Sequence, residues 1–164
     1  MATVERVHAI SHWCTLHGFR PVSKVMQGVL QALFGIVLPG GATVGSGTLF
    51  AYRGVGVVVH ARAIIGAKCL VSPGVTIGGR SRLEEVPVIE DEVFIGAGAR
   101  ILGPVRVGKG SVIGANAVVV HDVPARSLVA GMPAQVIRRE INVRDYTSLP
   151  GDAAEVTLAP GPGY

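Results

Sequence analysis

Residues 88–119 read VIEDEVFIGAGARILGPVRVGKGSVIGANAVV, and within them an aliphatic side chain returns at every sixth position. Four positions after the aliphatic residue comes a small or modest side chain, such as Ala99 after Ile95 and Ala117 after Ile113. The same spacing extends back toward the N-terminus in one register. The aliphatic positions are Val59, Ile65, Val71, Ile77, Leu83, Ile89, Ile95, Ile101, Val107, Ile113 and Val119.

A repeat of six residues matches neither the 3.6-residue period of a helix nor the two-residue alternation of an ordinary strand. It is typical of a triangular solenoid, in which each hexad supplies one short strand and one corner, and three hexads complete a coil. Glycine directly after the aliphatic residue, as at Gly96 and Gly108, suits a tight corner. We therefore expect an all-β fold, a left-handed parallel β-helix of hexapeptide repeats with a short N-terminal helical segment.

The sequence divides into three segments. Residues 1–35 form the N-terminal helical segment, because Pro21 suits a helix start, apolar residues follow at helical spacing, and Gly35 ends the pattern. We expect this segment to cap the open end of the solenoid or to contact another subunit; a membrane-surface contact is the alternative. Residues 36–137 form the β-helix domain. Residues 138–164 form a C-terminal extension, expected to be mobile after residue 144.

Composition narrows the function classes. Charged residues make up 16% and aromatic residues 5%, which disfavours both a helical bundle and a disordered chain. No apolar run reaches the roughly 18 residues of a membrane span. The sequence shows no secretory signal, so we expect a cytoplasmic protein. Cys14 and Cys69 are read as buried apolar residues. The net charge of +4 comes from scattered residues without a basic run, so we expect no nucleic-acid partner.

Two breaks in the repeat coincide. His60 occupies the corner position after Val59 that glycine fills in other hexads. Gly78 follows eighteen residues later, one coil above, and there the pattern gives way to residues 79–87. If these residues project as a loop, they leave the solenoid directly over His60. Because the pKa of histidine suits removal of a proton from a hydroxyl near neutral pH, His60 is the candidate catalytic residue. The alternative is an exposed corner residue without a role.

A metal site is not expected. A solenoid zinc enzyme would need three converging imidazoles, and the repeat offers only His60 and His121. Their separation of 61 residues is not a multiple of the 18-residue coil, so they do not stack.

Three stretches carry a family resemblance. Residues 74–79 (GVTIGG), residues 95–103 (IGAGARILG), and Asp122-Val123-Pro124 followed by Gly131-Met132-Pro133-Ala134 resemble the hexapeptide-repeat acyltransferases, and among them the serine acetyltransferase branch. The resemblance covers about residues 36–140. It implies a homotrimer that binds acetyl-CoA as co-substrate in the groove between adjacent solenoids. It also implies direct acetylation of a hydroxyl, the chemistry that serves cysteine biosynthesis.

The chain departs from this family at two positions. Arg53 stands where the family's Asp-His-Gly-Thr-Gly segment has its catalytic histidine, because that segment aligns with residues 52–56. A second family histidine, just before a loop proline, aligns with Val86 before Pro87. Residues 54–60 instead resemble a glycine, valine and histidine stretch of short relatives in polysaccharide or natural-product pathways, which points to His60 for proton transfer.

The leading hypothesis is an acetyl-CoA-dependent O-acetyltransferase with His60 as general base and L-serine or a similar small molecule as acceptor. The alternatives are an O-acetyltransferase acting on a sugar or natural-product precursor and a catalytically silent trimeric scaffold. The candidate acceptor-binding residues are Tyr52, Arg53, Arg80 and Glu85, for whose arginines solvated loop charge is the alternative. The candidate cofactor-binding residues are Gly78 and Gly79 through their backbone N–H groups, Ala97, Gly98 and Ala115 beneath the pantetheine, and Arg138 and Arg139 at the nucleotide phosphates.

Overall fold

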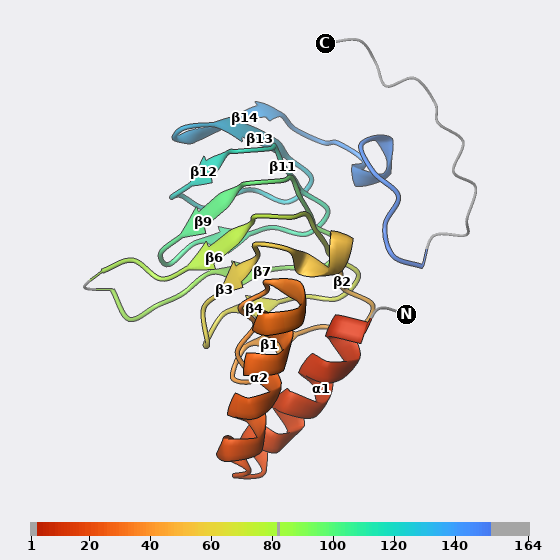
Figure 1. Cartoon of the computed structure of the whole chain (residues 1–164). Helices are drawn as coiled ribbons and strands as arrows, with labels where there is room; N and C mark the ends of the chain where they lie inside the picture. The colour runs from red at the N-terminus through yellow and green to blue at the C-terminus, as the bar shows by residue number, and fades with distance from the viewer. Residues whose placement is uncertain (1–2, 82, 152–164) are drawn as a thin grey trace.

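The computed structural model describes residues 3–81 and 83–151, which form a three-sided parallel β-solenoid with a helical hairpin at its N-terminal end (Figure 1). One four-stranded sheet contains β1 (Thr43–Val44), β4 (Ile64–Ile65), β7 (Val88–Ile89) and β10 (Arg106–Val107). A second contains β3 (Val58–Val59), β6 (Thr76–Gly78), β9 (Arg100–Leu102) and β12 (Val118–Val119). The six-stranded sheet contains β2 (Leu49–Phe50), β5 (Leu70–Val71), β8 (Phe94–Ile95), β11 (Val112–Ile113), β13 (Leu128–Gly131) and β14 (Ala134–Arg138). The fold class expected from the hexads is confirmed.

The aliphatic positions of the hexads form the core. Val59 pairs with Ile77, and Ile77 pairs with Ile101, so inward side chains stack directly above one another from coil to coil. Of the eleven aliphatic positions from Val59 to Val119, nine are at most 1% exposed and Val59 is 2% exposed; the remaining one is Leu83. This continuous column of buried aliphatic groups is what the six-residue spacing produces.

Leu83 is a correction to the expected register. Its side chain is 43% exposed, because residues 79–87 leave the solenoid as a loop that projects sideways between β6 and β7 (Figure 1). Ile65 pairs with Ile89, which lies 24 residues later instead of 18. The loop therefore lengthens this coil by one hexad, and the aliphatic residues on either side of it keep their six-residue spacing.

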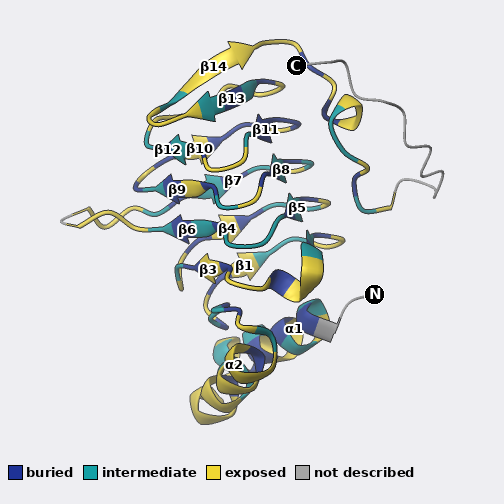
Figure 2. Cartoon of the chain, turned by 45° about the horizontal axis from the view of Figure 1, so that its top comes forward, coloured by how far each residue is buried: buried dark blue, intermediate teal, exposed yellow. Residues whose placement is uncertain are grey.

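The helical hairpin covers the N-terminal end of the solenoid (Figure 2). It consists of α1 (Thr3–Leu16) and α2 (Arg20–Phe34), and Gly35 ends α2 in the left-handed conformation with its N–H donating to Gln31. Val4 and Leu30 are fully buried in the same apolar cluster as the solenoid core. The outer face of α2 remains exposed at Val25 and Leu33. No helix in the described part of the chain is long and apolar enough to cross a bilayer.

The C-terminal extension packs against the outside of the six-stranded sheet. After β14 the chain continues through a short 3-10 helix, η2 (Val143–Asp145), and the side chains of Ile141, Val143 and Leu149 are buried with Val112. The chain that was expected to be mobile after residue 144 is thus packed at Leu149. Residues 152–164, which share that expectation, lie outside the described residues.

Candidate active site

The predicted site residues fall on two of the three solenoid corners. The His60 corner, which follows β3, β6, β9 and β12, carries residues 60–62, the loop 79–87, residues 103–104 and residues 120–122. The Arg53 corner, which precedes the same four strands, carries residues 51–56, 72–74, 96–98 and 114–116. Along the Arg53 corner, Gly74 donates to Val55, and Asn116 donates to Ala97. The sheet β3-β6-β9-β12 separates the two corners within one chain.

His60 lies beneath the projecting loop. Its backbone N–H donates to the carbonyl of Ile77 in the coil above at 2.7 Å, which fixes the corner against the start of the loop. A Cβ atom built on Gly79 would lie 3.6 Å from Cδ2 and 3.7 Å from Nε2 of His60, and 3.9 Å from a methyl group of Val86. The start of the loop therefore lies close to the imidazole, and Val86 at its end lies close to Gly79.

A backbone contact bears on the protonation of His60. The N–H of Arg62 donates to Nδ1 of His60 at 3.2 Å. In a neutral imidazole one ring nitrogen donates and the other accepts, so an accepting Nδ1 leaves the proton on Nε2. A general base acting through Nε2 would need the opposite tautomer and would lose the bond from Arg62.

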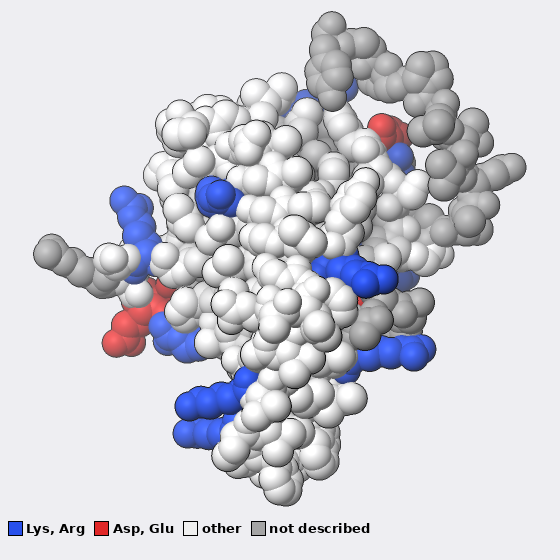
Figure 3. Space-filling model, viewed as in Figure 1, with Lys and Arg blue, Asp and Glu red and all other residues white. Residues whose placement is uncertain are grey.

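Charged residues surround the loop. Figure 3 shows acidic and basic side chains gathered where the loop projects from the solenoid. The guanidinium of Arg62 donates through Nη2 to the backbone carbonyl of Glu84. The side chain of Arg80 packs against Gly103 in the next coil. A Cβ atom built on Gly103 would lie 3.3 Å from Cβ and 3.5 Å from Cδ of Arg80. Glu85 is exposed beside Glu84. Arg80 and Glu85, two predicted acceptor-binding residues, thus share a corner with His60.

Tyr52 and Arg53 lie on the other corner. They form part of a short 3-10 segment, η1 (Ala51–Gly54), with φ angles of 51° and 60° in the left-handed region. The Tyr52 side chain is 82% exposed. The Arg53 guanidinium lies 5.6 Å from the centre of the Phe34 ring, a cation–π contact with the end of α2. Within one chain these two residues do not join His60.

The predicted pantetheine surface shares the Arg53 corner. Ala97 and Ala115 are exposed and stack in adjacent coils, and Gly98 follows Ala97 in the same coil with a φ of 72°. A Cβ on Gly98 would lie 2.2 Å from Oδ1 of Asn116, so only glycine fits there without a shift. Small side chains at Ala97 and Ala115 leave this corner open to an extended ligand.

Arg138 and Arg139 are placed away from this surface. Gly131 pairs with Ala134 at one end of the β13–β14 hairpin, and Leu128 pairs with Arg138 at the other. The guanidinium of Arg138 donates to the hydroxyl of Tyr146 at 3.3 Å. The structure therefore does not bring these arginines next to Ala115 within a chain.

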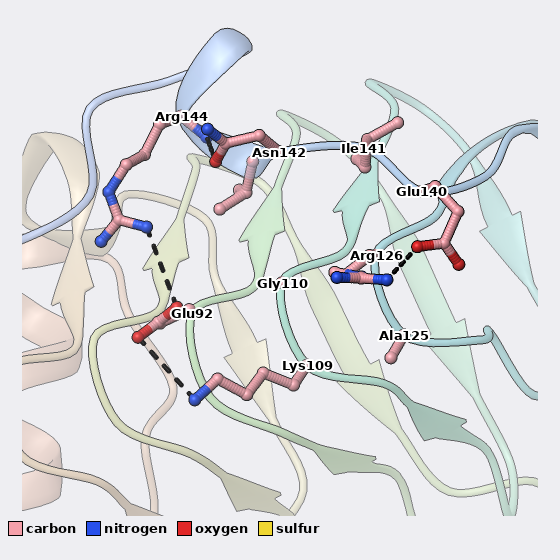
Figure 4. A pocket seen from close by; sticks show the side chains of 10 residues that line it. Glu92, Lys109, Gly110, Ala125, Arg126, Glu140, Ile141, Asn142 and Arg144 are labelled. Carbon is pink, nitrogen blue, oxygen red and sulfur yellow. Dashed lines mark hydrogen bonds and ion pairs between the residues drawn. The ribbon is translucent and has the colours of Figure 1, made fainter.

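The structure also contains a cavity of about 520 Å³ on the third corner, beneath the C-terminal extension (Figure 4). Its charged groups pair with one another. The carboxylate of Glu92 lies 3.9 Å from Nζ of Lys109 through Oε1 and 3.9 Å from Nη1 of Arg144 through Oε2. The guanidinium of Arg126 pairs with the carboxylate of Glu140. None of the predicted site residues lines it. In the described residues no group of three histidine, cysteine or acidic side chains is arranged to hold a metal ion.

Comparison with known proteins gives a consistent result. Residues 87–121 match the model of the family described as bacterial transferase hexapeptide (six repeats). The chain is 37% identical over 147 residues to a serine acetyltransferase of Bacillus subtilis, with 84% of this chain and 67% of that protein covered. It is 33% identical over 154 residues to a serine acetyltransferase of Synechococcus elongatus, with 91% and 63% covered.

Solved structures agree. A serine acetyltransferase of Brucella abortus in complex with coenzyme A superposes with a TM-score of 0.79 at 33% identity, covering 82% of this chain and 54% of that one. A Neisseria gonorrhoeae serine acetyltransferase in complex with serine gives 0.78 at 33% identity, covering 82% and 55%. The chain spans between about half and two thirds of the length of these relatives.

Proposed function

Because the chain belongs to the serine acetyltransferase family of hexapeptide-repeat transferases, we propose that it is an acetyl-CoA-dependent O-acetyltransferase with His60 as its catalytic residue. The acceptor is the hydroxyl of L-serine or of a similar small molecule. In the overall reaction the acceptor oxygen bonds to the acetyl carbon and the thioester C–S bond breaks. The hydroxyl proton ends on the thiol of CoA.

The position of His60 carries this proposal. It is a half-buried imidazole at a corner where other hexads have glycine, and a charged loop lies directly above it. Few corners of a solenoid place a polar ring beside a loop, and this corner is one of them. Gly78 and Gly79, at the base of the loop, are the proposed N–H donors to the oxyanion, and Arg80 and Glu85 are the proposed contacts of the acceptor.

The proposed site is completed between chains. Tyr52, Arg53 and the Ala97-Gly98-Ala115 surface lie on one edge of the sheet β3-β6-β9-β12, and His60 lies on the other. In a homotrimer the Arg53 corner of one copy faces the His60 corner of the next, and acetyl-CoA lies in the groove between them. Arg138 and Arg139, proposed for the nucleotide phosphates, lie at the end of β14 away from this groove, and Arg138 donates to Tyr146. Both cysteines are buried free thiols, which fits the proposed cytoplasmic location.

The test measures CoA release from acetyl-CoA with a thiol reagent while L-serine, homoserine and a panel of sugars are added in turn. We expect release with one acceptor class and a loss of about a hundredfold or more in His60→Ala, which removes both the base and the donor capacity of the ring. His121→Ala is the matched control, because His121 is an exposed histidine on the same corner. Light scattering should give three times the chain mass of 16.9 kDa. A trimer that releases no CoA with any acceptor would favour the silent scaffold.

A further inference from the structure

Arg62 makes two contacts that join His60 to the loop above it. Its backbone N–H donates to Nδ1 of His60 at 3.2 Å, and its guanidinium donates to the carbonyl of Glu84. We propose that Arg62 is a positioning residue that holds His60 as a hydrogen-bond donor and holds the loop 79–87 over the ring. This inference rests on the proposed function, because His60 is the catalytic residue there.

The backbone contact decides which nitrogen of His60 carries the proton. Nδ1 accepts from Arg62, so neutral His60 carries its proton on Nε2. Nε2 lies toward Gly79 at the base of the loop. In this state His60 donates to the oxygen of the attacked acetyl carbonyl. The oxygen–carbon bond forms, the C–S bond breaks, and the acceptor proton passes to the departing sulfur while His60 keeps its own proton.

The side-chain contact holds the loop. Leu83, Glu84 and Glu85 are exposed, so the apolar core does not fix this part of the chain. The loop turns at Arg80, whose carbonyl accepts from the N–H of Leu83 at 3.0 Å. The Arg62 guanidinium donates to the carbonyl of Glu84, just after this turn, and so links the loop to the coil that carries His60. Without this hydrogen bond the loop would move away from the imidazole, and the acceptor would bind more weakly.

Among the described residues, the charged groups on this corner are Arg62 and Asp122 on the solenoid and Arg80, Glu84 and Glu85 on the loop. A donor role and a base role respond differently to pH. A base must be unprotonated to take the acceptor proton, so lowering the pH would lower kcat/KM. A donor keeps its Nε2 proton when the ring is protonated, so that fall would be absent.

Three measurements test the proposal. Nitrogen NMR of the wild-type protein at neutral pH should show His60 with a protonated Nε2 and a bare Nδ1. Arg62→Ala should speed amide exchange at Leu83 about tenfold and raise the acceptor KM by a similar factor, with kcat nearly unchanged. Arg62→Lys should restore most of both. Arg100→Ala is the control for exchange, because the Arg100 guanidinium also donates to a backbone carbonyl, that of Gly74.

Two results would overturn the proposal. One is a wild-type spectrum in which Nδ1 carries the proton and Nε2 is bare. The other is an Arg62→Ala variant with unchanged exchange at Leu83 and unchanged acceptor KM. The NMR and exchange measurements need no turnover, so they decide the role of Arg62 even if no acceptor is acetylated and the proposed function itself fails.

Discussion

Gly79 and His60 lie in van der Waals reach of one another across adjacent coils. The position that a Cβ atom would take on Gly79 is 3.6 Å from Cδ2 and 3.7 Å from Nε2 of His60. These are ordinary contact distances, and Gly79 does not have a positive φ, so the backbone accepts other residues. The space above the imidazole exists because position 79 carries no side chain.

A larger residue at position 79 should therefore block the site without unfolding the protein. We expect Gly79→Val to lower kcat/KM for the acceptor at least tenfold, while the free energy of unfolding changes by about 0.5 kcal/mol or less. Gly79→Ala, which adds one methyl group at contact distance, should keep most of the activity. CoA release and urea unfolding of both variants measure this, and a Gly79→Val variant with wild-type kinetics would contradict the placement of the acceptor above His60.

Ile77 and Leu83 occupy equivalent positions in the hexads but different environments. Ile77 is fully buried, whereas Leu83 is 43% exposed. We expect Ile77→Ala to lower the free energy of unfolding by about 2–5 kcal/mol, because it leaves a cavity in the core. Leu83→Ala should change it by about 0.5 kcal/mol or less. Equal losses in the two variants, measured by urea unfolding, would mean that Leu83 points into the solenoid after all.

Gly98 should be intolerant of a side chain for two reasons that can be separated. Its φ of 72° is unfavourable for other residues, and a Cβ would lie 2.2 Å from Oδ1 of Asn116. We expect Gly98→Ala to destabilise the protein by about 1–3 kcal/mol. Adding Asn116→Ala should recover the part caused by the clash and leave the backbone part. A double-mutant cycle by thermal or urea unfolding measures the coupling, and strict additivity would contradict the contact.

His8 should make stability depend on pH. Its side chain is 4% exposed, and the backbone of Ala42 and Leu38 next to the ring only partly offsets the cost of burying a charge there. Burial, and next the neighbouring His12, lower the pKa of His8 from 6.5 to about 4. The unfolded chain therefore binds more protons than the native one between these values, and stability falls as the pH drops from about 6.5 to 4.

From pH 7.5 to pH 5.0 this difference amounts to about 2 kcal/mol. We expect His8→Phe, which keeps a ring of similar shape, to lose that part of the pH dependence. Urea unfolding at the two pH values compares the variant with the wild type. An identical slope in both proteins would show that His8 does not titrate below its ordinary range.

The sequence predicts the solenoid well because one inward aliphatic group per hexad is both the repeat and the core. The same regularity hides the loop. Residues 79–87 add a whole hexad, so Leu83 keeps the spacing of a core residue although it sits outside the core. Glycine and proline flank the loop in the sequence, at Gly79 and Pro87, and they are the signals that mark where the chain leaves the coil.

The site was predictable only in part. The sequence predicts His60 and the loop because a histidine replaces a corner glycine one coil below the break in the repeat. Arg62 was missed, since its contacts are a backbone N–H and a carbonyl 22 residues away, neither of which shows in side-chain type. The spacing of residues also does not tell which corner a residue occupies. Arg53 therefore looked close to His60 in sequence, although a strand and a sheet face lie between them.

The stacking of coils fixes the distances between residues along the solenoid axis, as well as stabilising the fold. β3, which precedes His60, and β12, which follows Ala115, are the first and last strands of the same four-stranded sheet. Parallel neighbours are roughly 4.8 Å apart, so three steps put about 14 Å between those levels. Distances along the solenoid axis therefore change only in steps of one coil. A duplicated or deleted coil between His60 and Ala115 would leave the aliphatic column continuous, yet it would change the distance between their levels by one strand spacing, roughly 4.8 Å.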